Sequence, residues 1–63
     1  MWIITNGNGW YLGETRYNTI KQEQETDLTT EEAKARRFET EAQADAENRA
    51  CGLVNDGYYP EEL

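Results

Sequence analysis

The chain has 63 residues, and its 13 acidic and 6 basic side chains give a net charge of −7 at neutral pH. This charge opposes direct binding to nucleic acid or to anionic lipid, and it favours a protein partner that carries a basic surface. One cysteine and no histidine exclude an internal disulfide and, in practice, a structural zinc site.

The length predicts one domain over residues 1–63, near the lower size limit for independent folding. No apolar run approaches the roughly 20 residues that a membrane helix needs. The first residues, Met1–Ile4, lack the basic region and the length of a signal peptide. Together with the single cysteine, these features lead us to expect a cytoplasmic protein.

The N-terminal residues predict two strands joined by a turn. Residues 1–5 are β-prone, and residues 10–13 resume that character after Asn6–Gly9, whose Asn and Gly residues tolerate positive φ. We expect Thr5 to pair with Trp10 in the resulting hairpin. One face of the hairpin would then carry Met1, Ile3, Thr5, Trp10 and Leu12, and the other would carry Trp2, Ile4 and Tyr11.

Both faces of this predicted hairpin are apolar, so both need cover. We expect the main helix to cover one face. The other face is covered by Tyr58 and Tyr59 of the chain's own tail, by a second copy of the chain, or by a foreign partner. The tail, residues 53–63, contains the turn Asn55–Gly57 and is expected to fold back onto the rest of the molecule.

The middle of the chain predicts a third strand and a loop. Residues 15–21 alternate in character as a strand does, with Tyr17 and Thr19 on one face and Ile20 on the other. Residues 22–27 are polar throughout, which is typical of a loop.

Two capping signals predict helices over residues 30–37 and 41–51. Thr29 with Glu32, and Thr40 with Gln43, each have the spacing of a reciprocal capping box. Gly52 suits a left-handed C-cap. One continuous helix remains an alternative, because a single helical stripe contains Ala35, Phe38, Ala42, Ala46, Ala50 and Leu53.

These elements together predict an α+β fold. In it, a small antiparallel meander of two or three strands packs against one main helix that a short helix precedes.

Four segments of the chain resemble small orphan proteins encoded by phages and prophages. They are an aromatic-Ile-Ile strand, an Asn/Gly turn, a Gly-x-x-Leu return strand and an Ala-x-x-Phe-x-Thr helix entry. In this chain they are Trp2–Ile4, Asn6–Gly9, Gly9–Leu12 and Ala35–Thr40. The resemblance implies a class of roles that includes anti-CRISPR proteins and other inhibitors of host nucleic-acid machinery. It concerns scaffold motifs, so no functional residue follows from it.

Carboxylates and aromatic side chains are the candidate binding residues. The densest acidic cluster consists of Glu23, Glu25, Asp27, Glu31 and Glu32, and the candidate aromatic anchors are Trp2, Tyr11 and Tyr17. The acidic cluster is either an ordinary solvated face or a surface that binds a basic groove on another protein. Literal mimicry of DNA would need an unbroken row of carboxylates, and Lys34, Arg36 and Arg37 interrupt it.

No residue pattern indicates catalysis, a cofactor or a metal. Glu41 and Asp45 lie one helical turn apart, but the chain has neither histidine nor serine to act with them. Cys51 is interpreted as a small residue near a helix end. The sequence therefore predicts a non-enzymatic inhibitor or modulator that binds a basic surface of a host protein, such as a CRISPR or other defence complex. The alternative is a self-associating structural or regulatory domain that forms a homodimer.

Overall fold

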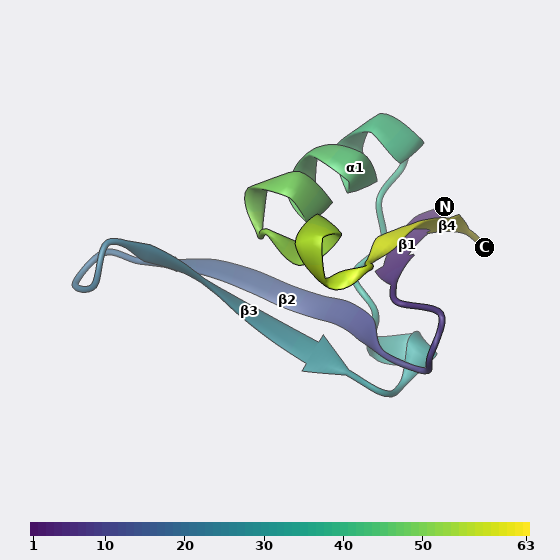
Figure 1. Cartoon of the computed structure of the whole chain (residues 1–63), viewed down its shortest axis with the longest axis horizontal. Helices are drawn as coiled ribbons and strands as arrows, with labels where there is room; N and C mark the ends of the chain where they lie inside the picture. Colours follow the sequence, from purple (N-terminus) through teal and green to yellow (C-terminus); the bar gives the residue numbers. More distant parts are fainter.

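One α-helix and four strands make up the molecule in a computed structural model that describes all 63 residues (Figure 1). The strands form an antiparallel sheet in the order β3-β2-β1-β4. The predicted α+β class is therefore confirmed, although the sheet has four strands and not the two or three that we expected. The elements are β1 (Trp2–Thr5), β2 (Tyr11–Asn18), β3 (Glu23–Thr29), α1 (Glu41–Ala50) and β4 (Tyr59–Glu62), with 3₁₀ turns at Glu32–Lys34 and Leu53–Asp56.

The short strand β1 is the centre of the fold, and both of its faces are buried. Ile3 and Ile4 are both 0% exposed and Thr5 is 2% exposed, although successive side chains of a strand point to opposite faces. On the face of Ile4, α1 packs over a core cluster that also contains Leu12, Phe38, Ala44, Leu53 and Tyr58. Tyr59, on the neighbouring β4, lies directly opposite Thr5.

The register of the first hairpin differs by one residue from the prediction. Thr5 lies opposite Tyr11, and Trp10 belongs to the loop, where its carbonyl accepts a hydrogen bond of 2.8 Å from the Thr5 hydroxyl. The Asn6 side chain stabilises this loop by accepting from the backbone N–H groups of Asn8 and Trp10. Because a one-residue slip exchanges the two faces, Leu12 joins Ile4 in the core and does not share a face with Ile3.

A single long strand replaces two predicted strands, and a second strand replaces a predicted loop. Strand β2 continues through Gly13, where a bulge between Leu12 and Thr15 shifts the register against β3. Strand β3 occupies most of the polar segment 22–27 that we expected to be a loop. Its sequence lacks apolar alternation because both of its faces meet solvent over much of its length, and pairing with β2 stabilises it instead.

The predicted helix over 30–37 is wrong. Thr29 accepts from the N–H of Glu31, not of Glu32, and only a 3₁₀ turn forms at Glu32–Lys34. Residues 35–38, which we call the extended segment, follow this turn. They lie between β1 and β2, which pair with each other only where Thr5 meets Tyr11. Phe38 and Trp2 exchange two backbone hydrogen bonds of 2.8 Å, and the N–H of Arg36 donates to the carbonyl of Leu12 at 2.9 Å.

Helix α1 begins and ends almost where the sequence predicts. Thr40 caps it by accepting from the N–H of Gln43 at 3.1 Å, and Gly52 follows with φ of 74°. The Gln43 side chain, however, accepts from the N–H of Glu39 and does not return to Thr40. A separate helix is thus confirmed, and a continuous rod is excluded.

The buried face of α1 is not the predicted alanine stripe. Ala44 and Asn48 are buried, whereas Ala42, Ala46 and Ala50 are exposed. The two faces differ by about 200° around the helix axis. Because the segment before Thr40 is extended, the position of Phe38 does not determine which face of α1 is buried. On the buried face, the Asn48 amide donates to the carbonyl of Tyr58 at 2.9 Å.

The tail folds back as predicted, and it does so as a strand. After Gly57, with φ of 84°, β4 pairs along the whole of β1. Tyr58 is buried in the core, and the N–H of Leu63 donates to the carbonyl of Met1. Neither α1 nor any other helix has the length and the apolar character that crossing a membrane requires.

Candidate protein-interaction surface

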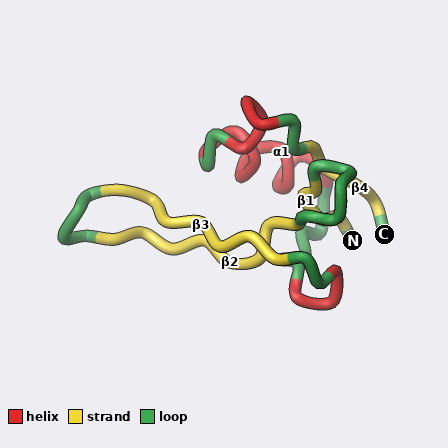
Figure 2. Tube along the Cα trace, turned by 60° about the horizontal axis from the view of Figure 1, so that its bottom comes forward, coloured by secondary structure: helices red, strands yellow, loops and turns green.

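The distal part of the β2–β3 hairpin, residues 14–27, extends past α1, and its tip projects beyond the rest of the molecule (Figures 1 and 2). We refer to this part of the hairpin as the arm. It accounts for much of the longest dimension of the molecule, which measures 35 × 23 × 20 Å. Its tip is ordered by Asn18, whose side-chain carbonyl accepts from the N–H groups of Ile20 and Lys21. Ile20 at the tip is 93% exposed.

Three of the predicted acidic residues share one face of the arm. Glu23, Glu25 and Asp27 alternate along β3, so their side chains leave the strand on the same side. Arg16 of β2 lies among them, 3.3 Å from Glu25 and 3.0 Å from Asp27, and it also reaches Glu14 at 3.8 Å. One guanidinium group thus serves three carboxylates while Glu23 has no cationic partner, so this face keeps a surplus of negative charge.

The carboxylate of Glu25 is held in its charged form. Asn18 donates a hydrogen bond of 2.9 Å to it, and this bond, followed by the bond from Arg16, lowers the pKa of Glu25 below its ordinary value. The pKa of Arg16 is raised in turn, chiefly by its hydrogen bond to Glu25. At neutral pH the arm therefore presents fixed charges in a defined geometry.

The remaining predicted partner-binding residues lie elsewhere. Glu31 and Glu32 belong to the turn that follows β3, where Lys34 pairs with Glu31 at 2.8 Å. Tyr17 is on the arm and 63% exposed, but it pairs with Gln24 and so lies on the face opposite to Glu25. Trp2 packs against the core cluster and Tyr11 is half-buried between Thr5 and Thr29, so neither is a free anchor.

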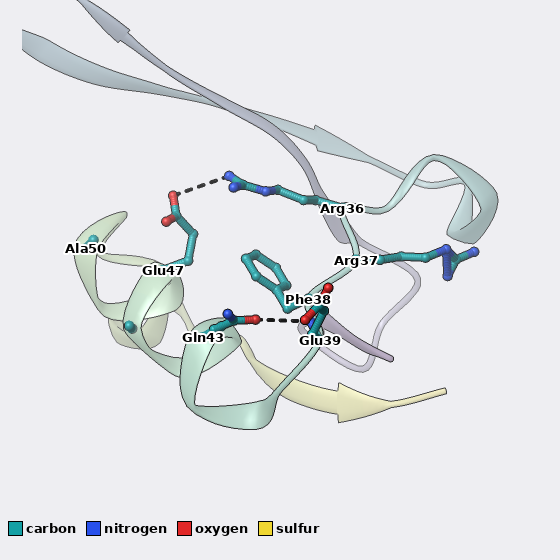
Figure 3. A pocket seen from close by; sticks show the side chains of 8 residues that line it. Arg36, Arg37, Phe38, Glu39, Gln43, Glu47 and Ala50 are labelled. Atoms are coloured by element: carbon teal, nitrogen blue, oxygen red, sulfur yellow. Dashed lines mark hydrogen bonds and ion pairs between the residues drawn. The ribbon is translucent and has the colours of Figure 1, made fainter.

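A groove of about 660 Å³ between α1 and the extended segment is a feature that the sequence did not predict (Figure 3). Arg36 spans it, donating to the Thr15 hydroxyl at 2.6 Å and lying 3.8 Å from Glu47. Its guanidinium group also lies 5.1 Å from the centre of the Phe38 ring. The groove is lined by Arg36, Arg37, Phe38, Glu39, Gln43, Ala46, Glu47 and Ala50. The sequence features that could have indicated this groove are the run Arg36–Phe38 and the alanines of α1. We expected those alanines to be buried.

The charges of the groove balance, since it has two arginines and two glutamates. Arg36 serves as a structural link between β2, the extended segment and α1. Arg37 turns its side chain away from the groove (Figure 3). This arrangement joins parts of the fold, and it lacks the surplus charge that distinguishes the arm.

Cys51 lies beside the end of α1, next to Gln24 and Glu47 at 3.4 and 3.5 Å. Burial raises the pKa of its thiol, so Cys51 is protonated at neutral pH. No group of three or more carboxylate or thiol side chains is arranged to hold a metal ion. No family model matches the chain, and no curated protein or solved structure matches it.

Proposed function

We propose that this chain is a non-enzymatic protein-binding module whose arm binds a basic surface of another protein. The observation that supports the proposal is the carboxylate face of the arm, where Glu23, Glu25 and Asp27 lie on one side of a projecting hairpin. In line with the resemblance to phage proteins, the partner is a nucleic-acid-binding protein of the host, such as a defence complex, and the effect is inhibition or modulation.

The geometry of the arm suits such a role. A ribbon of two strands that projects from the body can enter a groove that a flat surface cannot reach. Ion pairs exposed to solvent contribute little to stability, so releasing Arg16 from the carboxylates in favour of a partner's cations costs little. Complementary charge raises the rate of association and selects the partner.

A pair of triple variants with equal charge changes tests the proposal. The arm variant carries Glu23→Gln, Glu25→Gln and Asp27→Asn. The control carries Glu39→Gln, Glu61→Gln and Glu62→Gln, which replace exposed carboxylates outside the arm. A partner is first isolated from host cytoplasm with the unchanged protein, and its affinity for all three proteins is then measured by calorimetry at low and high salt.

We expect the arm variant to bind at least about tenfold more weakly, which is about 1.4 kcal/mol, and the control to bind within about threefold of the unchanged protein. Binding by the unchanged protein should also weaken as the salt concentration rises. Equal losses in the two triple variants would show that net charge alone matters, and unchanged binding by the arm variant would refute the proposal.

A further inference from the structure

The two edges of the sheet are not equivalent. At the β4 edge, the N–H of Leu63 donates to Met1 of β1, so alternation directs the backbone groups of Glu61 and Tyr59 towards β1 as well. Pro60 and Glu62 then direct theirs outwards. Because proline has no N–H, Pro60 interrupts the outer row of donors, which disfavours the pairing of a further strand along this edge.

The β3 edge carries an uninterrupted row of backbone groups. The carbonyl of Leu12 accepts from Arg36, on the side of β2 away from β3. Leu28 lies opposite Leu12, so its own N–H and C=O point away from β2. Counting back in steps of two, Thr26 and Gln24 have the same orientation. These three residues therefore present backbone donors and acceptors along an edge that no other strand of the chain covers.

We propose that the β3 edge binds an extended basic segment of the partner as a fifth, antiparallel strand, with Lys or Arg at alternate positions. The inference rests on the proposed function and specifies how the arm would bind. The added strand forms its backbone hydrogen bonds with Gln24, Thr26 and Leu28. Its cationic side chains lie opposite Glu23, Glu25 and Asp27.

The positions of the carboxylates suit this mode of pairing. Glu23, Glu25 and Asp27 lie between the outward-facing residues, so they would form the non-hydrogen-bonded pairs with the added strand. Opposite residues in such pairs approach to about 4.5 Å between Cα atoms, the closest spacing in an antiparallel ladder. Each carboxylate of β3 would then have β2 on one side and a cationic side chain of the partner on the other.

The same carboxylates disfavour a second copy of the chain as the occupant of this edge. If two β3 strands paired antiparallel about Glu25, each Glu23 would lie opposite an Asp27 and the two Glu25 residues would face each other. Like charges directly opposite one another destabilise a strand pair. Charge therefore selects a basic foreign strand over self-association.

Three synthetic peptides of equal charge test the inference with the unmodified protein. The parent peptide is acetyl-Val-Lys-Thr-Lys-Thr-Lys-Thr-amide, which places lysines opposite the three carboxylates in antiparallel addition. One derivative is N-methylated at the threonines, whose N–H groups would face β3. The other is N-methylated at the lysines, whose N–H groups would face solvent. Affinities and backbone amide shifts are measured by NMR titration.

We expect the parent and the lysine-methylated peptide to bind within about threefold of each other, and the threonine-methylated peptide to bind at least about tenfold more weakly. The amides of Gln24, Thr26 and Leu28 should shift and become protected from hydrogen exchange. Equal binding by the two methylated peptides, or no binding by any of the three, overturns strand addition. Loss of partner binding in the arm triple variant would still support the proposed function, so the two failures are distinguishable.

Discussion

At the scale of single residues, the neighbours of Glu25 keep its carboxyl group charged. Its lowered pKa has Asn18 as the first cause and Arg16 as the second. A carboxyl group with a lowered pKa stabilises the folded state above the ordinary glutamate pKa of about 4.3, and this stabilisation is lost as the pH falls through the folded value.

We therefore expect Asn18→Asp to raise the pKa of Glu25. The change removes the donor and adds a negative charge, and it keeps the side-chain oxygen that accepts from Ile20 and Lys21. Carboxyl-detected NMR titration measures the pKa directly. The stability difference between the unchanged protein and Glu25→Gln should shrink as the pH falls below about 4. An unchanged titration midpoint in Asn18→Asp would contradict the assigned cause.

Asn48 carries a buried polar group that connects α1 to the start of β4. It is 1% exposed, and its amide donates to the Tyr58 carbonyl at the point where the chain enters β4. Asn48→Ala leaves that carbonyl without its donor and should cost about 1–3 kcal/mol. Urea unfolding measures this cost. Asn55→Ala, at an exposed position, is the control and should change stability by less than about 0.5 kcal/mol.

At the scale of elements, the extended segment before α1 determines how the helix packs. Phe38 is 7% exposed, exchanges backbone bonds with Trp2, and is the only aromatic residue that this segment adds to the core. We expect Phe38→Ala to cost about 3–5 kcal/mol. A chain of this length has a total stability of about 3–9 kcal/mol, so we expect circular dichroism to show the variant at least partly unfolded at 25 °C.

Two variants make that outcome interpretable. Phe38→Leu retains most of the apolar volume and should remain folded with a smaller loss. Val54→Ala shortens an apolar side chain that is 38% exposed and should cost less than about 1 kcal/mol. If Phe38→Ala were no more harmful than Val54→Ala, the role of Phe38 in the core would be refuted.

The phase of α1 can be tested with a matched pair of alanine substitutions. Ala44 is 0% exposed, whereas Ala46 is exposed on the other side of the helix. Ala44→Gln should cost at least about 1–3 kcal/mol through overpacking, and Ala46→Gln should change stability by less than about 0.5 kcal/mol. If thermal unfolding showed Ala46→Gln to be the less stable variant, the buried face of α1 would be the alanine stripe that the sequence predicts.

At the scale of the whole molecule, the arrangement of strands favours a monomer. The sequence left open whether a second copy of the chain covers the sheet face that α1 does not cover. Ile3 and Thr5 lie on that face, and both are already buried within the single chain. Pro60 interrupts the β4 edge, and the carboxylates of β3 repel a second β3. We expect size-exclusion chromatography with light scattering to give the mass of one chain at micromolar concentrations. A dimer there would revive the alternative of a self-associating domain.

The sequence predicts the local features of this fold and of its site. Thr40 and Gly52 bound α1 because capping and left-handed backbone depend on residues within a few positions of each other. The acidic residues Glu23, Glu25 and Asp27 were also recognised in the sequence, but the segment that contains them was predicted to be a loop. That they share one face became clear when β3 was found to pair with β2.

Features that depend on distant partners were decided by the tertiary structure. A polar strand such as β3 forms because β2 supplies its hydrogen bonds, and residues 35–38 are extended because Leu12 and Trp2 bind their backbone. The buried face of α1 follows from the positions of Tyr58 and β1, which local periodicity does not encode. By itself the sequence determined the class of fold, the ends of the helix and the excess of negative charge. Only long-range pairing decided which edge of the sheet is open and where that charge is displayed.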